Sequence, residues 1–228
     1  NSTLAWNSWP TGTFTGSIAQ IQGTDTDTSP RLDDTVTTQG VVTAVYVAGG
    51  LNGFYMQTEG TGGAADATPG ASDAIFVFGN NATSVGPVVG DFVSVTGPVA
   101  EFSGSTQIVP AAGGVTKING DPHTDPTPFV GALPGSDCAL GACPTTLALE
   151  AAREAREGEV YAPTGPFTVT NSFSLTNGAN GFMEIGLAAD DEPLVAPTEV
   201  EDFQTGDVAA RTAYNSARAI TLDDGASL

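Results

Sequence analysis

The residues able to support acid–base or nucleophilic catalysis are few in this chain. Its single histidine, His123, stands in the sequence Asp-Pro-His-Thr-Asp-Pro. A serine or cysteine nucleophile needs a base held within hydrogen-bond distance, and a proline-rich turn rarely holds one in place. We therefore predict no catalytic role for His123, and hence neither a Ser-His-Asp triad nor a Cys-His pair.

Paired carboxylates could still hydrolyse a glycoside, because that reaction needs only an acid and a base or nucleophile at a suitable separation. The candidates on or beside predicted strands are Glu101, Glu184 and Glu199. Alternate residues of a strand commonly face solvent, and no spacing pairs any two of these glutamates. Neither a phosphate-binding glycine-rich loop with its lysine nor a His-Glu-x-x-His sequence is present. We expect that the chain is not an enzyme.

An acidic stretch near the start of the chain offers oxygen ligands for a hard cation such as calcium. Its members are Asp25, Asp27, Asp33 and Asp34. The pattern does not match an EF-hand loop, and a solvated loop is the alternative interpretation. Ca²⁺ is thus the one cofactor that the sequence suggests, and no predicted activity requires any cofactor.

The two cysteines, Cys138 and Cys143, enclose the sequence Ala-Leu-Gly-Ala. This spacing permits a small disulfide loop that contributes about 2 kcal/mol by the chain-entropy estimate. Two thiols and a lone histidine do not make a structural zinc site. Because disulfides persist in oxidising surroundings, we predict a Cys138–Cys143 disulfide and a secreted, extracellular protein.

The charge balance limits the partners of the protein. The chain of 228 residues has 26 acidic and 6 basic residues, which give a formal charge of −20. Duplex DNA is bound mainly through Lys and Arg contacts to phosphate, so we predict weak duplex binding or none. The basic residues form no cluster in the sequence; they are Arg31, Lys117, Arg153, Arg156, Arg211 and Arg218.

Membrane and targeting segments are not evident. No run of about 18 apolar residues exists that could span a bilayer, so we expect no membrane association. The start, Asn1-Ser2-Thr3, lacks the basic and apolar regions of a signal peptide. We expect a mature, processed chain.

Several strand-like runs follow one another within residues 35–109 and must position any site. They are residues 41–47, 54–57, 74–78, 91–96, 99–102 and 106–109, separated by glycine turns. Short strands with a long, bent first one predict an OB-like barrel. The side chains expected in its core are those of Val42, Val45, Phe54, Met56, Ile75, Val77, Val93 and Val95.

A proline-rich break divides the chain near residues 113–144. After it, the sequence predicts a short helix capped by Thr145 or Thr146, strands at 167–170 and 182–185, a second helix at 207–217 and a closing strand at 220–222. The fold class is therefore mainly β, with two OB-like barrel units, the second shortened, and two short helices. The predicted parts are an extended arm (1–16), an OB-like domain (17–120), a Pro-rich connector with a small disulfide loop (121–144) and a second OB-like domain (145–228).

Isolated aromatic and apolar residues are the predicted interaction anchors. In the N-terminal arm these are Leu4, Trp6 and Trp9, which could add to a neighbouring sheet or pack on their own domain. In the barrel they are Tyr46, Phe54 and Tyr55, on which a single-stranded nucleic acid could stack.

Nearly the whole chain resembles a known type of accessory region. The matching segments are IAQIQG at 18–23, TVTTQGVVTA at 35–44, GFYMQ at 53–57, SDAIFV at 72–77, VGDFVSVTG at 89–97, PTEV at 197–200, NSAR at 215–218 and ITLDDG at 220–225. They are similar to the OB-type region that precedes the catalytic domain in large secreted bacterial nucleases of the endonuclease/exonuclease/phosphatase superfamily. The catalytic domain has no counterpart here, so the resemblance assigns no catalytic residue.

Two functions of different classes are therefore predicted. The first, implied by the resemblance, is a non-catalytic OB-fold binding or positioning region of a secreted nuclease-like hydrolase. Such a region would hold substrate or orient the catalytic part, with a catalytic nuclease domain or like subunits as its partner. The alternative is an extracellular structural protein that forms homo-oligomers through its N-terminal arm and open sheet edges.

Overall fold

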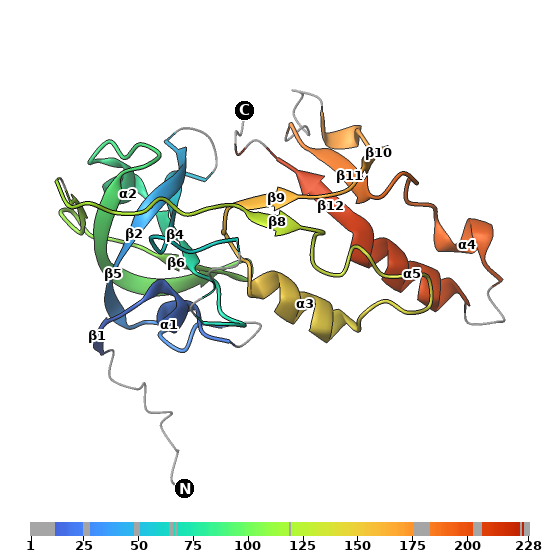
Figure 1. Ribbon diagram of the computed structural model, residues 1–228, viewed down its shortest axis with the longest axis horizontal. Coiled ribbons are helices and arrows are strands. Elements are labelled where there is room, and N and C mark those ends of the chain that lie inside the picture. Colours follow the sequence, from blue (N-terminus) through green and yellow to red (C-terminus); the bar gives the residue numbers. More distant parts are fainter. Residues whose placement is uncertain are drawn as a thin grey trace, which may run out of the picture.

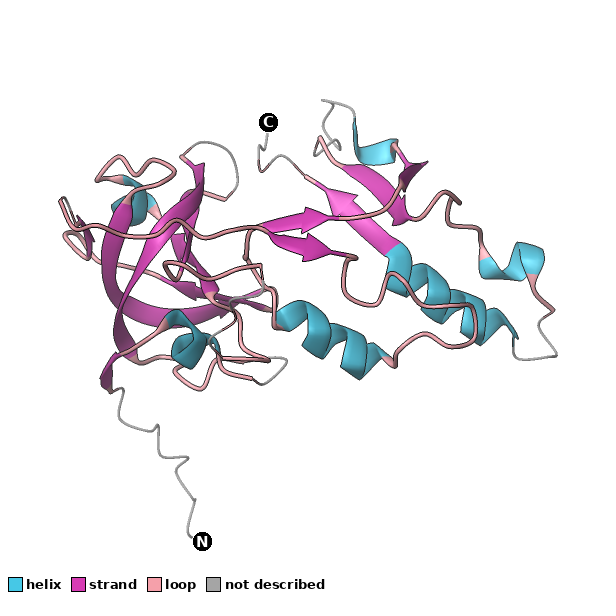
Figure 2. Ribbon diagram, in the orientation of Figure 1, coloured by secondary structure: helices cyan, strands magenta, loops and turns pink. Residues whose placement is uncertain are grey.

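The computed structural model describes residues 12–24, 28–47, 51–63, 66, 68–118, 120–175, 183–202, 207–223 and 225. These residues form twelve strands in three sheets, together with five short α-helices and one 3-10 helix. The mainly β class predicted from the sequence is confirmed. A β-rich part lies beside a longer part that contains the two longest helices (Figure 1, Figure 2).

The largest sheet contains seven strands in the order β1-β2-β3-β4-β6-β5-β7. Their bounds are β1 (Thr13–Thr15), β2 (Thr35–Tyr46), β3 (Gly53–Gln57), β4 (Ala74–Phe78), β5 (Phe92–Phe102), β6 (Ser105–Ile108) and β7 (Val115–Lys117). Strand β5 also pairs with β2, so β2, β3, β4, β6 and β5 form a closed circuit of paired strands. We call these five strands the strand ring.

Two long strands make this closure possible because each pairs with different neighbours along its length. The first half of β2 pairs with β5, from Thr35↔Pro98 to Val41↔Phe92, and its second half pairs with β3. A register shift between Val42 and Ala44 marks the bend. Strand β5 likewise pairs with β2 and β7 before it turns and pairs with β6.

The strand ring encloses the main hydrophobic core. Seven of the eight predicted core residues are buried there, and the eighth, Val45, is partly buried against it. Helices α1 (Ile18–Gln22) and α2 (Asn80–Thr83) contribute Ile18, Ile21 and Ala82 to the same core. Helix α1 begins with a capping box, in which the Ser17 hydroxyl accepts a hydrogen bond from the Gln20 amide at 3.3 Å. These short helices were not predicted from the sequence.

Residues 121–144, predicted to be a connector, make specific contacts with the strand ring and with later residues. The Gly60 amide donates to the Thr124 carbonyl at 2.8 Å, and the Thr127 amide donates to the Thr61 carbonyl at 2.9 Å. Strand β8 (Phe129–Gly131) then pairs in parallel with β9 (Tyr161–Pro163). The segment therefore lies along the domain that it was expected merely to connect.

The C-terminal part contains an open antiparallel sheet in the order β10-β11-β12. Its elements are α3 (Thr146–Glu154), β10 (Phe167–Asn171), the 3-10 helix η1 (Phe173–Leu175), β11 (Ile185–Ala189), α4 (Pro197–Val200), α5 (Asp207–Arg218) and β12 (Ala219–Leu222). Both predicted helices are present as α3 and α5, and Thr145 caps α3. In the described residues this sheet does not close as the strand ring does, so a second OB-like unit is not confirmed. The predicted strand 182–185 overlaps β11 only at Ile185, and Phe182 lies outside the described residues.

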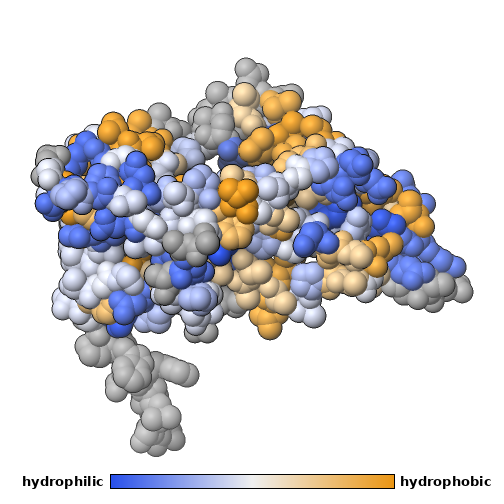
Figure 3. Space-filling view, viewed as in Figure 1, coloured by the Kyte–Doolittle hydropathy of each residue, from blue (hydrophilic) through white to orange (hydrophobic). Residues whose placement is uncertain are grey.

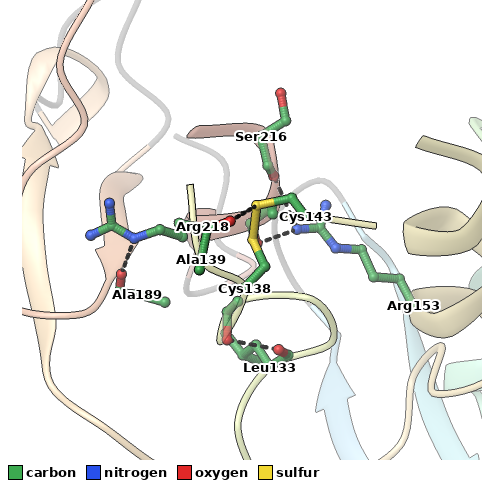
Figure 4. Close-up of a disulfide and its surroundings, with 10 residues drawn as sticks. Leu133, Cys138, Ala139, Cys143, Arg153, Ala189, Ser216 and Arg218 are labelled. Atoms are coloured by element: carbon green, nitrogen blue, oxygen red, sulfur yellow. Dashed lines mark hydrogen bonds between the residues drawn. A yellow bond between two sulfur atoms is a disulfide. The ribbon is translucent and has the colours of Figure 1, made fainter. Parts of the chain in front are cut away.

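The predicted disulfide is present, with Cys138 and Cys143 joined and their Cα atoms 4.8 Å apart. It lies near the end of α5, where the Arg153 guanidinium donates to the carbonyls of Ser216 and Ala217 at 3.2 and 3.1 Å (Figure 4). Of the helices in the described parts of the chain, none is long and apolar enough to cross a membrane.

Candidate functional site

An aromatic hollow on the outside of the strand ring is the candidate functional site. It has a volume of about 340 Å³ and is lined by Leu51, Tyr55, Phe76, Phe78, Phe102, Ser105 and Gln107. We call it the aromatic groove. Strands β3, β4 and β6 form its floor, while residues that precede β3 and end β5 form its walls.

Side-chain alternation explains why these residues meet. In β3, Phe54 and Met56 point into the core, so Tyr55 points outward; in β4, Ile75 and Val77 point inward, so Phe76 and Phe78 point outward. The register pairs Tyr55 with Phe76, and Phe76 with Gln107 of β6. Three adjacent strands thereby place one row of side chains on the same outer face.

The aromatic rings form a continuous series across this face. Ring centroids are 6.3 Å apart for Tyr46 and Tyr55, 4.8 Å for Tyr55 and Phe76, and 6.5 Å for Phe76 and Phe78. Phe78 and Phe102 expose 37% and 69% of their surface, whereas Phe76 is buried beneath its neighbours. The groove therefore combines a rigid aromatic floor with accessible aromatic walls.

The segment after α3 covers one side of the groove. The Val160 amide donates to Gln57 Oε1 at 3.0 Å, and the Ser72 hydroxyl donates to the Glu157 carbonyl at 2.6 Å. Gly158 has a positive φ of 70°, and a Cβ atom there would lie 2.8 Å from the Tyr55 ring. A glycine at this position thus lets the main chain pass directly over the outer face of β3.

An acidic side chain, that of Glu157, lies beside the groove. The Ser105 hydroxyl donates a hydrogen bond to the Glu157 carboxylate. Burial raises the pKa of Glu157, and the nearby Glu101 carboxylate raises it further, although the Ser105 hydrogen bond opposes both effects. Burial also raises the pKa of the Tyr55 hydroxyl, with smaller contributions from Glu157 and Tyr46. Glu157 therefore places an acidic group at the edge of the groove, and no Lys or Arg is among the residues that line it.

All six Lys and Arg residues of the chain are described, and each has a partner elsewhere. Lys117 forms an ion pair with Asp91 at 2.7 Å, and Arg156 contacts both Glu159 and Asp66 at 2.9 and 3.5 Å. The other partners are Asp34 for Arg31, Glu201 for Arg211, the Ser216 and Ala217 carbonyls for Arg153, and the Ala189 and Glu192 carbonyls for Arg218. None of these cations lines the aromatic groove.

The three predicted barrel anchors lie in different surroundings. Tyr55 lines the groove, and the Tyr46 ring packs edge-on against the Tyr55 ring. Phe54, in contrast, has no exposed surface and belongs to the core, so its prediction as a surface anchor is wrong. Because Phe54 and Tyr55 are adjacent on one strand, only one of them could face outward.

The predicted calcium ligands do not form a site among the described residues. The Asp34 carboxylate accepts a hydrogen bond from the Gly12 amide at 2.7 Å and lies 3.7 Å from Arg31. Asp33 is exposed with a positive φ of 66°. Asp25 and Asp27 lie outside the described residues, as do Leu4, Trp6 and Trp9. The described parts of the chain contain no group of three or more His, Cys, Asp or Glu side chains able to hold a metal ion.

The candidates for acid–base catalysis lie apart from the groove lining. The His123 ring stacks on Phe92 with centroids 5.2 Å apart, and its Nε2 lies 3.2 Å from the Gly90 carbonyl. His123 is thus held in place, contrary to the reasoning that a proline-rich turn leaves it unrestrained. Glu101 accepts hydrogen bonds from the Ser29 amide and the Thr106 hydroxyl at 2.8 and 2.9 Å, so it has a structural role rather than a solvent-facing one.

The remaining two glutamates are distributed over the C-terminal part. Glu184 is half-buried just before β11, and Glu199 is exposed on the short helix α4 rather than on a strand. Neither lines the groove. The solvent-facing prediction is therefore correct for Glu199 and only partly correct for Glu184.

Sequence reasoning missed most of the groove, namely Leu51, Phe76, Phe78, Phe102, Ser105 and Gln107. One usable signal was the run at residues 74–78, which is apolar on both faces of the strand although only one face of a barrel strand points into the core. The apolar residues on the other face must therefore lie on the outside of the barrel.

The chain matches no known protein-family model, and none of the curated proteins is significantly similar to it.

Proposed function

We propose that this chain is a non-catalytic, OB-type binding and positioning region of a secreted, nuclease-like hydrolase. The observation that carries the proposal is the closure of the strand ring, in which β2, β3, β4, β6 and β5 pair in that order and β5 returns to β2. OB-folds are five-stranded barrels whose outer face binds oligonucleotides or oligosaccharides. The strand ring has the number of strands that this architecture requires.

The position of the aromatic groove supports the same proposal. OB-folds bind their ligands on the face of their second and third strands, beside the loops that join strands one to two and four to five. In the strand ring, β3 and β4 are second and third in chain order. Leu51 comes from the first of these loops, whereas Phe102 and Ser105 flank the turn between β5 and β6. The groove thus lies where an OB-type ligand site is expected.

The secreted, nuclease-associated part of the proposal has two supports. The Cys138–Cys143 disulfide is compatible with an oxidising, extracellular setting. The resemblance to nuclease accessory regions extends over the strands of the ring, including GFYMQ in β3 and VGDFVSVTG entering β5. A catalytic nuclease domain is accordingly the proposed partner.

Hydrolysis assays and ligand titrations test this function together. The purified chain, incubated with DNA, RNA or a glycan and with Mg²⁺ or Ca²⁺, is expected to cleave none of them. In an NMR titration of a panel of small ligands, the binding ligand should shift the Tyr55 and Phe78 resonances, and Phe78→Ser should abolish that response. The matched control is Phe173→Ser, since Phe173 is 79% exposed but lies outside the groove. Cleavage of any substrate, or shifts confined to residues elsewhere, would overturn the proposal.

A second candidate, self-assembly, is favoured by one surface of the C-terminal sheet. The register aligns Val169 of β10, Leu187 of β11 and Ile220 of β12, and it aligns Ile185 with Leu222. One face of the sheet is therefore entirely apolar at these positions, and Val169 and Leu222 are 55% and 57% exposed. Apolar side chains gather over β10 and β11 (Figure 3). Exposed patches of this kind commonly mark interfaces.

Light scattering at high protein concentration tests self-assembly. If copies associate through this face, Val169→Lys and Leu222→Lys should each reduce the measured mass towards that of one chain. Val88→Lys is the control, because Val88 is 58% exposed but belongs to the loop before β5. Deletion of residues 1–11 tests the predicted anchors Leu4, Trp6 and Trp9 separately. A wild-type chain that remains monomeric would exclude assembly through either surface.

A further inference from the structure

We infer that the aromatic groove binds a small organic cation with a fully alkylated ammonium group, of the kind found in choline. This inference rests on the proposed binding role of the strand ring and names the chemical class of ligand. Four of the seven residues that line the groove are aromatic, and its volume is about 340 Å³. That volume lies at the lower end of the range of about 300–1,000 Å³ for ligand sites, which favours a compact ligand.

The ring geometry suits a cation. A positive group is attracted to the face of an aromatic ring when it lies within about 6 Å of the centroid. The Tyr55 and Phe76 centroids are 4.8 Å apart and those of Phe76 and Phe78 are 6.5 Å apart, with interplanar angles of 49° and 42°. Because these rings pack against one another and Phe76 is buried, a cation does not fit between them and would instead lie against the partly exposed Tyr55 and Phe78 rings. Phe102, which is 69% exposed, can close over it from the wall.

The charge around the groove also favours a cation over an anion. The Glu157 carboxyl group accepts a hydrogen bond from the hydroxyl of Ser105 in the lining, so an acidic group lies at the edge of the groove. No basic residue lines the groove, and all six Lys and Arg residues have partners elsewhere. A phosphate-bearing ligand would meet this negative potential without a cation to offset it. The same potential attracts a positive ligand.

The hydrogen-bonding groups of the lining distinguish among uncharged, primary and quaternary ligands. Among the described residues of the lining, Ser105 and Gln107 are the only polar side chains apart from the Tyr55 hydroxyl, and the Ser105 hydroxyl already donates to Glu157. A sugar or a primary ammonium brings several hydroxyl or N–H groups that lose water and need partners. A quaternary ammonium has no N–H group, so a mainly aromatic site accommodates it without leaving unpaired donors.

A pair of isosteric ligands tests the inference directly. Choline and its uncharged analogue 3,3-dimethyl-1-butanol have nearly the same shape, so their affinities differ mainly through the charge. In NMR titrations of the full chain we expect choline to bind about tenfold more tightly than the analogue, which corresponds to a cation–π contribution of about 1.4 kcal/mol. Phe78→Leu and Phe102→Leu should each weaken choline binding several-fold, whereas Phe173→Leu should leave it unchanged.

Each result decides the inference. Equal affinity for choline and the uncharged analogue would overturn it, while leaving the binding role of the groove intact. Choline binding that is insensitive to both groove substitutions, or no choline binding at millimolar concentrations, would overturn it as well. The hydrolysis assay is independent of these titrations, so a catalytic chain would refute the proposed function without deciding whether the groove binds choline.

Discussion

The Glu157 carboxylate joins the segment after α3 to the strand ring, in a place largely removed from water. Its Oε1 accepts a hydrogen bond from the Ser105 hydroxyl. Burial disfavours the charged form and raises the pKa of Glu157 above the ordinary value of 4.5. The folded protein thus holds the Glu157 proton more tightly than the unfolded chain does.

This pKa shift predicts a pH-dependent effect of Glu157→Gln. The stabilisation by protonated Glu157 is fully present below the unfolded pKa and is lost as the pH rises through the folded pKa. An amide keeps an acceptor for Ser105 but cannot ionise. In urea denaturation, the variant should match the wild type near about pH 4 and have the higher free energy of unfolding above the folded pKa. The exposed Glu199→Gln is the control, and a difference that does not vary with pH would contradict the prediction.

Arg218 is a buried cation that holds the C-terminal part together, with only 2% of its surface exposed. Its Nε and Nη2 donate to the carbonyls of Ala189 and Glu192, each at 2.7 Å, and its guanidinium lies 4.6 Å from the Tyr214 ring centroid (Figure 4 shows the Ala189 contact). A buried carbonyl that loses its donor pays the full cost of desolvation. Arg218 therefore has a structural role.

The matched pair Arg218→Met and Arg153→Met tests the importance of burial. Both arginines donate to two main-chain carbonyls, but Arg153 is exposed. We expect Arg218→Met to lower the free energy of unfolding by about 3 kcal/mol and Arg153→Met by about 1 kcal/mol or less. Chemical denaturation monitored by circular dichroism measures both changes. Equal losses in the free energy of unfolding would show that burial does not determine how much each arginine contributes.

At the level of elements, alternation predicted the strands of the ring well. Residues such as Phe54, Met56, Ile75 and Val77 could be assigned to the core because strands alternate and the flanking glycines mark the turns. The aromatic groove could not be assigned in the same way. Phe76 and Gln107 meet only because β4 and β6 pair in parallel, and such non-local pairings leave no local signal in the sequence.

The second predicted barrel shows the same limit of prediction from local sequence. The sequence around β10 and β11 repeats the strand–turn–strand pattern of β2 and β3, yet only the strand ring has a strand that pairs with different neighbours along its two halves. Strand β2 has 12 residues and pairs with β3 and β5, whereas β10 and β11 have 5 residues each. Local pattern thus predicted the strands but not whether they close.

The loop between residues 138 and 143 permits a prediction about the disulfide. Replacing both cysteines by serine removes a covalent constraint on a short loop of the unfolded chain, so the free energy of unfolding should fall by about 2 kcal/mol. Denaturation of the double variant, with Ser136→Ala just before the loop as a control, measures the difference. Mass spectrometry that finds both thiols free under non-reducing conditions would contradict the disulfide itself.

At the scale of the whole molecule, the net charge of −20 and the use of the basic side chains restrict which partners can approach. A large negative charge repels polyanions over about one Debye length, roughly 8 Å at physiological salt. Lys117, Arg156 and Arg211 each lie within 3 Å of a carboxylate oxygen. The Lys and Arg side chains are thus engaged within the protein, and the net charge favours the approach of cations over that of polyanions.

The last prediction is that this chain binds duplex DNA weakly or not at all, despite its resemblance to nuclease accessory regions. Duplex affinity comes mainly from cations that displace counterions, so that log K falls with log salt in proportion to the phosphates neutralised. Here each Lys or Arg would have to leave its present partner first. Fluorescence anisotropy with a labelled duplex, without divalent ions, should therefore show no binding at micromolar protein at about 150 mM salt. For any residual binding at low salt, the plot of log K against log salt should have a slope near zero. Micromolar affinity with a steep salt dependence would mean that the arginine contacts seen here give way to phosphate.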